Sequence, residues 1–102
     1  MAVQRPANLA IVVLDNEHYG ETGMQKAHTG LGVDLVAVAK GCGFQHTSLV
    51  TTMDGVAGLR NAIHTTSGPL YAQIKIEPTK QPFALPPRDG AELKNRFRVA
   101  VL

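Results

Sequence analysis

The clearest feature of the hydrophobic pattern is a continuous apolar run near the N-terminus. After Asn8 the sequence reads Leu-Ala-Ile-Val-Val-Leu to Leu14, and the polar pair Asp15 and Asn16 follows at once. Because the run does not alternate between apolar and polar residues, it predicts a strand covered on both faces, as in the interior of a parallel sheet. Such a strand is too apolar to lie bare at a sheet edge, so we expect neighbouring segments beyond this sequence.

The middle of the chain alternates between helical and extended patterns. Two segments repeat apolar residues at helical spacing after an aspartate that can cap a helix, and two others have the composition of strands. These predicted elements are a helix from Leu35 to about Cys42 capped by Asp34, a strand from Phe44 to Val50, a helix from Gly55 to about His64 capped by Asp54, and a strand from Leu70 to Ile76. Strands that alternate with helices predict an α/β domain, a parallel sheet with flanking helices.

The C-terminal quarter begins with a proline-rich stretch that predicts an extended, irregular connection. Its prolines are Pro78, Pro82, Pro86 and Pro87. The segment from Asp89 to Glu92 then has the pattern of a capping box, which opens a last helix. Leu93, Phe97 and either Ala100 or Val101 lie on one face of that helix.

Composition narrows the functional classes. Apolar residues make up 44% of the chain and charged residues 18%, which excludes a disordered segment, and no apolar run approaches the roughly 20 residues of a membrane span. The net charge of +2 is too small to support nucleic-acid binding. A charged fraction below the roughly 25% of ordinary domains indicates that much of the surface meets another chain, as in an oligomer.

The single cysteine, Cys42, excludes an internal disulfide framework and a cysteine-based zinc site. It suits a reducing compartment, so we expect a cytoplasmic protein. Because Cys42 lies on the apolar face of its predicted helix, we expect a buried, inert thiol. The four histidines have no metal-ligand spacing, and the glycine pairs lack a dinucleotide fingerprint and read as turns and caps.

Residues 15–32 form a long polar loop directly after the first strand, with Gly20, Gly23, Gly30 and Gly32 in it. A loop of this length without regular structure is usually functional, and ligands of open α/β sheets bind at the carboxyl ends of strands. An Asn side-chain oxygen and a backbone carbonyl two residues later are hard ligands of the kind that Mg²⁺ accepts. An Asx turn that merely ends the strand explains Asp15 and Asn16 equally well at this stage.

Two stretches together, from Ile11 to Gln25 and from Gly32 to Phe44, resemble the C-terminal cofactor domain of thiamine-diphosphate-dependent enzymes. Within that superfamily the pattern Asp-Asn followed by Glu-Thr-Gly-Met-Gln is most similar to the phosphonopyruvate and sulfopyruvate decarboxylases. The likeness continues through Ser67–Pro69 and Tyr71–Ile76 and covers nearly the whole chain. It implies that residues 1–102 form a single, partial C-terminal thiamine-diphosphate-binding domain with part of a three-layer fold.

The resemblance also implies roles for the loop residues. Asn16 corresponds to the side-chain ligand of Mg²⁺, and His18 to the ligand that acts through its backbone carbonyl. The cofactor-binding residues implied in this way are Asn16, Glu17, His18, Tyr19, Gly20, Glu21, Thr22 and Gly23. The resemblance assigns no catalytic residue to this chain.

One part of the family motif is missing. The motif opens upstream with Gly-Asp-Gly, but only fifteen residues precede Asn16 and none of them reads so. We therefore expect a fragment or subunit of a decarboxylase, a lyase acting on a 2-oxo acid, that is inactive alone. Its expected partners are an upstream cofactor-domain segment and a pyrimidine-binding domain or subunit. The alternative is a non-catalytic remnant or interaction module that keeps the fold without cofactor.

Overall fold

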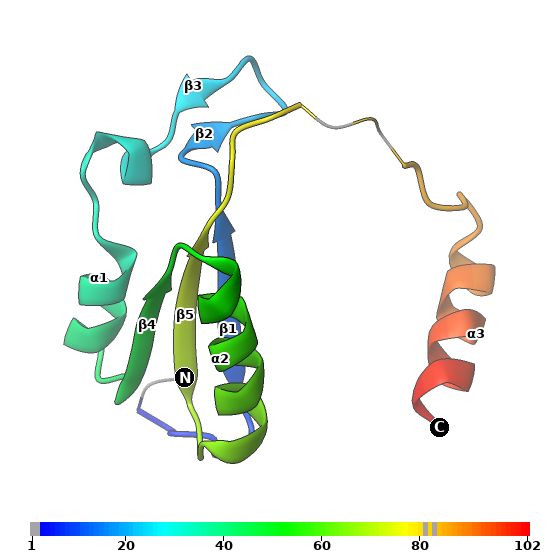
Figure 1. The fold of residues 1–102 in the computed structure, drawn as a ribbon. Coiled ribbons are helices and arrows are strands. Elements are labelled where there is room, and N and C mark those ends of the chain that lie inside the picture. Colours follow the sequence, from blue (N-terminus) through cyan, green and yellow to red (C-terminus); the bar gives the residue numbers. More distant parts are fainter. Residues whose placement is uncertain (1–2, 81, 83) are drawn as a thin grey trace.

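The computed structural model describes residues 3–80, 82 and 84–102. Its centre is a three-stranded parallel sheet with the strand order β1-β5-β4, and a small two-stranded sheet lies beyond one end (Figure 1). The elements in chain order are β1 (Ala10–Asp15), β2 (His18–Tyr19), β3 (Gln25–Lys26), the 3-10 turn η1 (His28–Leu31), α1 (Leu35–Gly41), β4 (His46–Val50), α2 (Met53–Thr65), β5 (Leu70–Lys75) and α3 (Gly90–Val101). The predicted α/β class with a parallel sheet is confirmed.

Strand β5 occupies the middle of the sheet and determines the register of the other two. Ala10 of β1 and His46 of β4 both lie opposite Leu70, and Asp15 at the end of β1 lies opposite Lys75. Since all three strands are parallel, their carboxyl ends meet at one edge of the sheet. That edge brings the residues after β1 next to the end of β5.

The hydrophobic core forms between α2 and one face of the sheet. Val56 and Leu59 of the predicted inward face of α2 pack there, whereas Ile63 is exposed. The buried residues of this cluster are Val50, Leu59, Leu70 and Ala72, with Val56, Ala62 and Ile74 packed against them. Because these residues come from both strands that flank α2 in the sequence, the β4-α2-β5 unit carries the core.

Side chains cap the three α-helices as their sequences lead one to expect, with one exception. Asp34 accepts a hydrogen bond from the Ala37 amide, and Asp89 caps α3, so both predicted caps are confirmed. The predicted cap of α2 is wrong, because the hydroxyl of Thr52 accepts from the Gly55 amide. The helix therefore begins at Met53, two residues before the predicted start, and Asp54 lies in its first turn.

Strand β1 lies at the edge of the sheet, and the expectation that both its faces are covered is wrong. Among the described residues only β5 pairs with it. The helix α2 contacts β4 and β5, so the part of the same face that belongs to β1 stays open. Val12 is 40% exposed and Leu14 is 65% exposed. An apolar strand is thus left without the charges, proline or bulge that usually protect a sheet edge.

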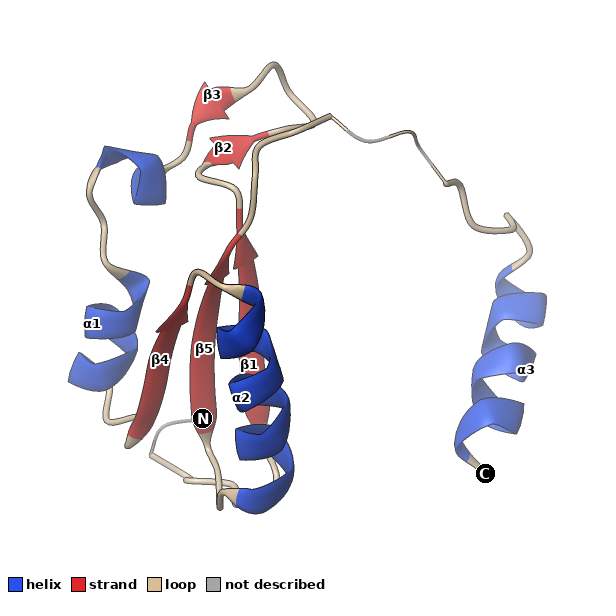
Figure 2. Ribbon diagram, in the orientation of Figure 1, coloured by secondary structure: helices blue, strands red, loops and turns tan. Residues whose placement is uncertain are grey.

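The C-terminal helix α3 lies apart from the sheet, across the proline-rich connection (Figure 2). None of its residues is buried, and its apolar face of Leu93, Phe97 and Val101 is exposed. The Cα radius of gyration is 16.4 Å, against about 13 Å for a compact domain of this length. No helix in the described ranges is both long and apolar enough to span a membrane.

Cys42 is exposed, so its predicted burial is wrong. The last residue of α1 is Gly41, and Cys42 is the C-cap, where the chain leaves the helix. Its backbone is still helical and its amide donates to the Val38 carbonyl, so Cys42 lies one turn after Val38, which is itself 55% exposed. This face of α1 is therefore not packed against the sheet.

We expect Leu59→Ala to lower the free energy of unfolding by about 2–4 kcal/mol, because it leaves a cavity between α2 and the sheet. Val99→Ala is the matched control, since Val99 is exposed on α3 and its truncation removes no buried contact. Urea denaturation of both variants measures the difference, and equal losses would contradict the assignment of the core.

The open β1 edge predicts that the isolated chain self-associates. Val12→Lys should reduce this association, because a lysine on an edge strand opposes pairing with another strand. Sedimentation velocity over a range of concentrations measures it. A wild-type chain that stays monomeric at high concentration would show that the edge does not attract other strands.

Candidate functional site

The segment after β1 is more ordered than the long, unstructured loop that the sequence predicted. Strands β2 and β3 form a short antiparallel hairpin in which His18 lies opposite Lys26 and Tyr19 lies opposite Gln25. The hairpin is closed by hydrogen bonds from the Thr22 and Met24 amides to the Tyr19 carbonyl. Strands of two residues give no periodicity, so the hydrophobic pattern contained no signal for them.

Two overlapping Asx turns lead from β1 into the hairpin. The Glu17 amide donates to Asp15 Oδ1 at 2.8 Å, and the His18 amide donates to Asn16 Oδ1 at 3.0 Å. The imidazole Nδ1 of His18 lies 2.9 Å from the Asn16 carbonyl oxygen. The Asx-turn alternative therefore describes the local structure. This turn does not exclude Asn16 Oδ1 as a metal ligand, because an amide oxygen keeps a second lone pair after it has accepted one hydrogen bond.

Asp15 is the centre of a buried polar cluster at this edge of the sheet. Besides the Glu17 amide, its carboxylate accepts from Thr29 Oγ1 at 2.7 Å, Gln73 Nε2 at 2.6 Å and Lys75 Nζ at 2.9 Å. The same Lys75 ammonium lies 2.6 Å from Glu17 Oε1. Asp15 is 7% exposed, and its four acceptor positions are all occupied. It is therefore unable to serve as a metal ligand in this arrangement.

The hydrogen bonds to Asp15 outweigh the effect of its burial on ionisation. Burial alone would raise its pKa, but the donors from Lys75, Thr29, the Glu17 amide and Gln73 together hold the pKa well below its ordinary value. The hydrogen bonds from Lys75 to Asp15 and Glu17 raise the pKa of Lys75. Both groups of the pair are thus charged over the whole physiological pH range.

Two shallow cavities adjoin Asn16 at the carboxyl ends of β1 and β5. One has a volume of about 280 Å³ and the other about 340 Å³. The first is lined by Asn16, Gly20, Glu21, Met24, Thr79, Lys80, Pro82 and Ala84, and the second by Asn16, Glu17, His18, Lys75, Ile76, Glu77 and Pro78. The proline-rich connection after β5 therefore borders the hairpin, an arrangement that the sequence did not reveal.

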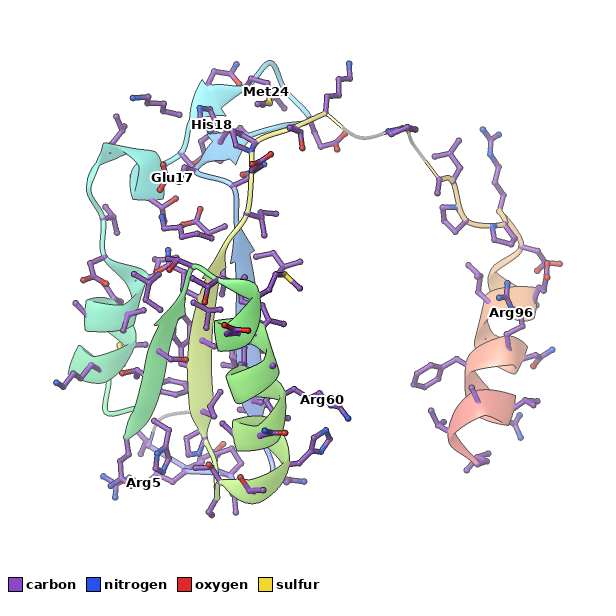
Figure 3. The ribbon with its side chains drawn as sticks, viewed as in Figure 1. Arg5, Glu17, His18, Met24, Arg60 and Arg96 are labelled. Atoms are coloured by element: carbon purple, nitrogen blue, oxygen red, sulfur yellow. The ribbon has the colours of Figure 1, made fainter. Side chains whose placement is uncertain are left out.

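The structure brings five of the predicted cofactor-binding residues to these cavities: Asn16, Glu17, His18, Gly20 and Glu21. Figure 3 shows Glu17 and His18 near each other beyond the end of β1, with Met24 on the hairpin above them.

The other three predicted residues, Tyr19, Thr22 and Gly23, do not line either cavity. The Tyr19 hydroxyl lies 3.3 Å from His28 Nδ1, and the Thr22 hydroxyl bonds Gln25. Gly23 has a φ of 122°, a turn conformation that side chains rarely adopt. Tyr19 thus contacts η1, and Thr22 bonds within the hairpin.

Sequence reasoning missed Thr29, Gln73 and Lys75. The signal was present in β5, where Gln73 and Lys75 are polar positions on the face opposite Ala72 and Ile74. A buried strand with two polar residues at alternate positions needs a polar partner, and Asp15 at the end of the neighbouring strand is that partner.

The donor set fits part of a magnesium site. Asn16 Oδ1 and the His18 carbonyl are neutral oxygen donors, while Asp15 is fully hydrogen-bonded and Glu17 is paired with Lys75. Mg²⁺ usually takes one or two carboxylates together with water and substrate phosphates. Among the described residues no group of three His, Cys, Asp or Glu side chains is placed to hold a metal ion. The two carboxylates on either side of Asn16 are thus already engaged in other contacts.

Comparison with known proteins relates the sequence of this chain to one group of enzymes. The beta subunit of sulfopyruvate decarboxylase from Methanothermobacter thermautotrophicus is 31% identical over 96 residues, which is 94% of this chain. Phosphonopyruvate decarboxylase from Streptomyces viridochromogenes is 33% identical over 97 residues, again 94% of the chain. The beta subunit of sulfopyruvate decarboxylase from Methanocaldococcus jannaschii is 37% identical over 59 residues, or 58% of the chain. The chain is a distant homologue of these decarboxylases.

The homology to the decarboxylases covers most of this chain but a smaller part of the relatives. The matched regions are 49%, 24% and 31% of the three relatives, so the chain spans less than half the length of each. The alignment with the Methanothermobacter protein covers 96 of the 102 residues. Because only a few residues at the ends of the chain lie outside it, the aligned region includes the Asn16 turn and Lys75. No family model matches the sequence, and no solved structure matches the fold.

Asp15→Asn tests the polar cluster. We expect it to lower the free energy of unfolding at pH 7 by about 2 kcal/mol, because it weakens hydrogen bonds to a charged, buried group. The folded pKa of Asp15 lies below the unfolded one, so its stabilisation is present above about pH 4 and is lost as the pH falls further. The difference between wild type and variant should therefore shrink in acid.

Urea denaturation at pH 7 and at about pH 2 measures this dependence. Asp54→Asn is the control, since Asp54 is exposed in the first turn of α2 and lies outside the cluster. A difference between wild type and Asp15→Asn that is the same at both pH values would contradict the assigned charge state.

Proposed function

We propose that this chain is part of a thiamine-diphosphate- and Mg²⁺-dependent lyase that decarboxylates a 2-oxo acid, similar to the sulfopyruvate and phosphonopyruvate decarboxylases. The observation that carries the proposal is the ordered turn from Asn16 to His18, at the carboxyl end of β1 and beside two cavities, in a homologue of those enzymes. Open α/β sheets bind ligands at this edge.

In this proposal the chain supplies one side of the anchor for Mg²⁺ and the diphosphate. Asn16 Oδ1 and the His18 carbonyl hold the metal ion, and Glu17, Gly20 and Glu21 line the cavities on either side. Thiamine diphosphate, when bound, provides the electron sink for loss of carbon dioxide. We assign no proton-transfer group to this chain, so its contribution is binding and orientation, and it is inactive alone.

The remaining parts of the enzyme are proposed to come from an upstream cofactor-domain segment with Gly-Asp-Gly and from a pyrimidine-binding domain or subunit. Three observations support this need for partners. The carboxylates of Asp15 and Glu17 are already paired with Lys75, the apolar strand β1 has an open edge with Val12 and Leu14 exposed, and two relatives are named as beta subunits. The single free thiol of Cys42 is in keeping with assembly in the cytoplasm.

Asn16→Ala should weaken the binding of thiamine diphosphate in the presence of Mg²⁺ by at least about tenfold, because it removes one oxygen ligand of the metal. Calorimetric titration of the complex that purifies with the chain measures the affinity. Asn95→Ala, on the exposed surface of α3, is the matched control and should bind as wild type does.

Unchanged affinity in Asn16→Ala would contradict the assignment of the anchor. A wild-type complex that binds no thiamine diphosphate and keeps the same melting temperature in its presence would favour the alternative, a non-catalytic interaction module with the same fold.

A further inference from the structure

Lys75 occupies an unusual position relative to the Asn16 turn. Its ammonium lies 2.9 Å from Asp15 Oδ2 and 2.6 Å from Glu17 Oε1, and these are the residues on either side of Asn16. The side chain comes from the last residue of β5, directly opposite Asp15 in the sheet register. One cation of the central strand thus holds both ends of the turn that presents Asn16.

The backbone conformation of Glu17 explains why the turn needs the ion pair with Lys75 to hold it in place. Its φ of 61° lies in the left-handed region, which residues with a Cβ atom rarely adopt. Its amide donates to Asp15, and its carbonyl accepts from the Ala27 amide at 2.8 Å. A Cβ atom on Gly30 would lie 2.7 Å from that carbonyl oxygen, so the backbone of η1 approaches closely only because residue 30 is glycine.

The positive charge of Lys75 also reduces the negative charge of the turn. Glu17 borders the cavity beside Asn16, and an unpaired carboxylate there would repel an anionic ligand. The ion pair with Lys75 compensates the Glu17 charge, while the hydrogen bonds around Asp15 keep the other carboxylate inside the protein. The Glu77 carboxylate lines the same cavity, which makes compensation of Glu17 more important.

We propose that Lys75 is a positioning residue for the Mg²⁺–diphosphate anchor: by bridging Asp15 and Glu17 it holds the Asn16 turn in its binding conformation and offsets one of the negative charges that would oppose the diphosphate. This inference rests on the proposed function. Lys75 acts through its two carboxylate partners and is not itself a ligand of the metal.

The first test needs no cofactor. In the full chain, Lys75→Met removes the charge and keeps the length of the side chain, Lys75→Arg keeps the charge, and Lys40→Met is the control on an exposed lysine of α1. We expect hydrogen exchange of the Glu17 and His18 amides, followed by NMR, to be about tenfold faster in Lys75→Met, equivalent to about 1.4 kcal/mol of local stability. Lys75→Arg and Lys40→Met should exchange like wild type.

Amides of the α2 core serve as an internal reference in the same spectra. Faster exchange there as well would mean that Lys75 stabilises the whole fold and not the turn in particular. That result, or unchanged exchange at Glu17 and His18, would overturn the proposal.

The second test separates this inference from the proposed function. Thiamine diphosphate with Mg²⁺ is titrated calorimetrically into the wild-type complex and into the Asn16→Ala, Lys75→Met and Lys75→Arg variants. We expect weaker binding in the first two and recovery in Lys75→Arg. Weaker binding in Asn16→Ala with wild-type binding in Lys75→Met would refute the positioning role alone. No difference in Asn16→Ala would refute the anchor itself, and the exchange experiment would still decide what Lys75 does to the turn.

Discussion

One buried carboxylate, that of Asp15, joins the parts of this molecule that the site depends on. Its donors come from the turn that follows β1, from η1 through Thr29, and from β5 through Gln73 and Lys75. A carboxylate that is removed from water must have such partners, because an unpaired buried charge is strongly destabilising. The need to satisfy Asp15 therefore holds the hairpin segment against the sheet.

The hydrogen bonds and ion pairs around Asp15 also decide which residues of the turn are candidate metal ligands. Asp15 is saturated and Glu17 is paired, so the candidate metal ligands of the turn are Asn16 Oδ1, which accepts one hydrogen bond, and the His18 carbonyl, and both are neutral. A site with two neutral donors holds a divalent cation only together with negative groups from other molecules or segments. The open edge of β1 and the separate position of α3 show the same incompleteness in the packing of the chain.

The sequence predicted most of the fold because its signals were local. The caps of α1 and α3 depend on Asp34 and Asp89, which act within three residues of their own position. The predictions that failed depend on packing between elements that are distant in the sequence, or on two neighbouring side chains that could both cap the same helix. The exposure of Cys42 follows from which face of α1 packs on the sheet, and the exposure of Leu14 follows from which strands α2 covers. Thr52 was available as a cap two residues before Asp54.

By itself, the sequence determined the α/β class and predicted a ligand site at the strand exit, and the resemblance to a known family named Asn16 and His18 as its candidate ligands. The fold class and the strand exit depend on residue type and order, which the hydrophobic pattern expresses directly. Only the tertiary structure decided that Asp15 is held by Lys75 and Gln73, about sixty residues away in the chain. The parallel register of β1 and β5 creates that contact, and no local pattern encodes a register between strands so far apart.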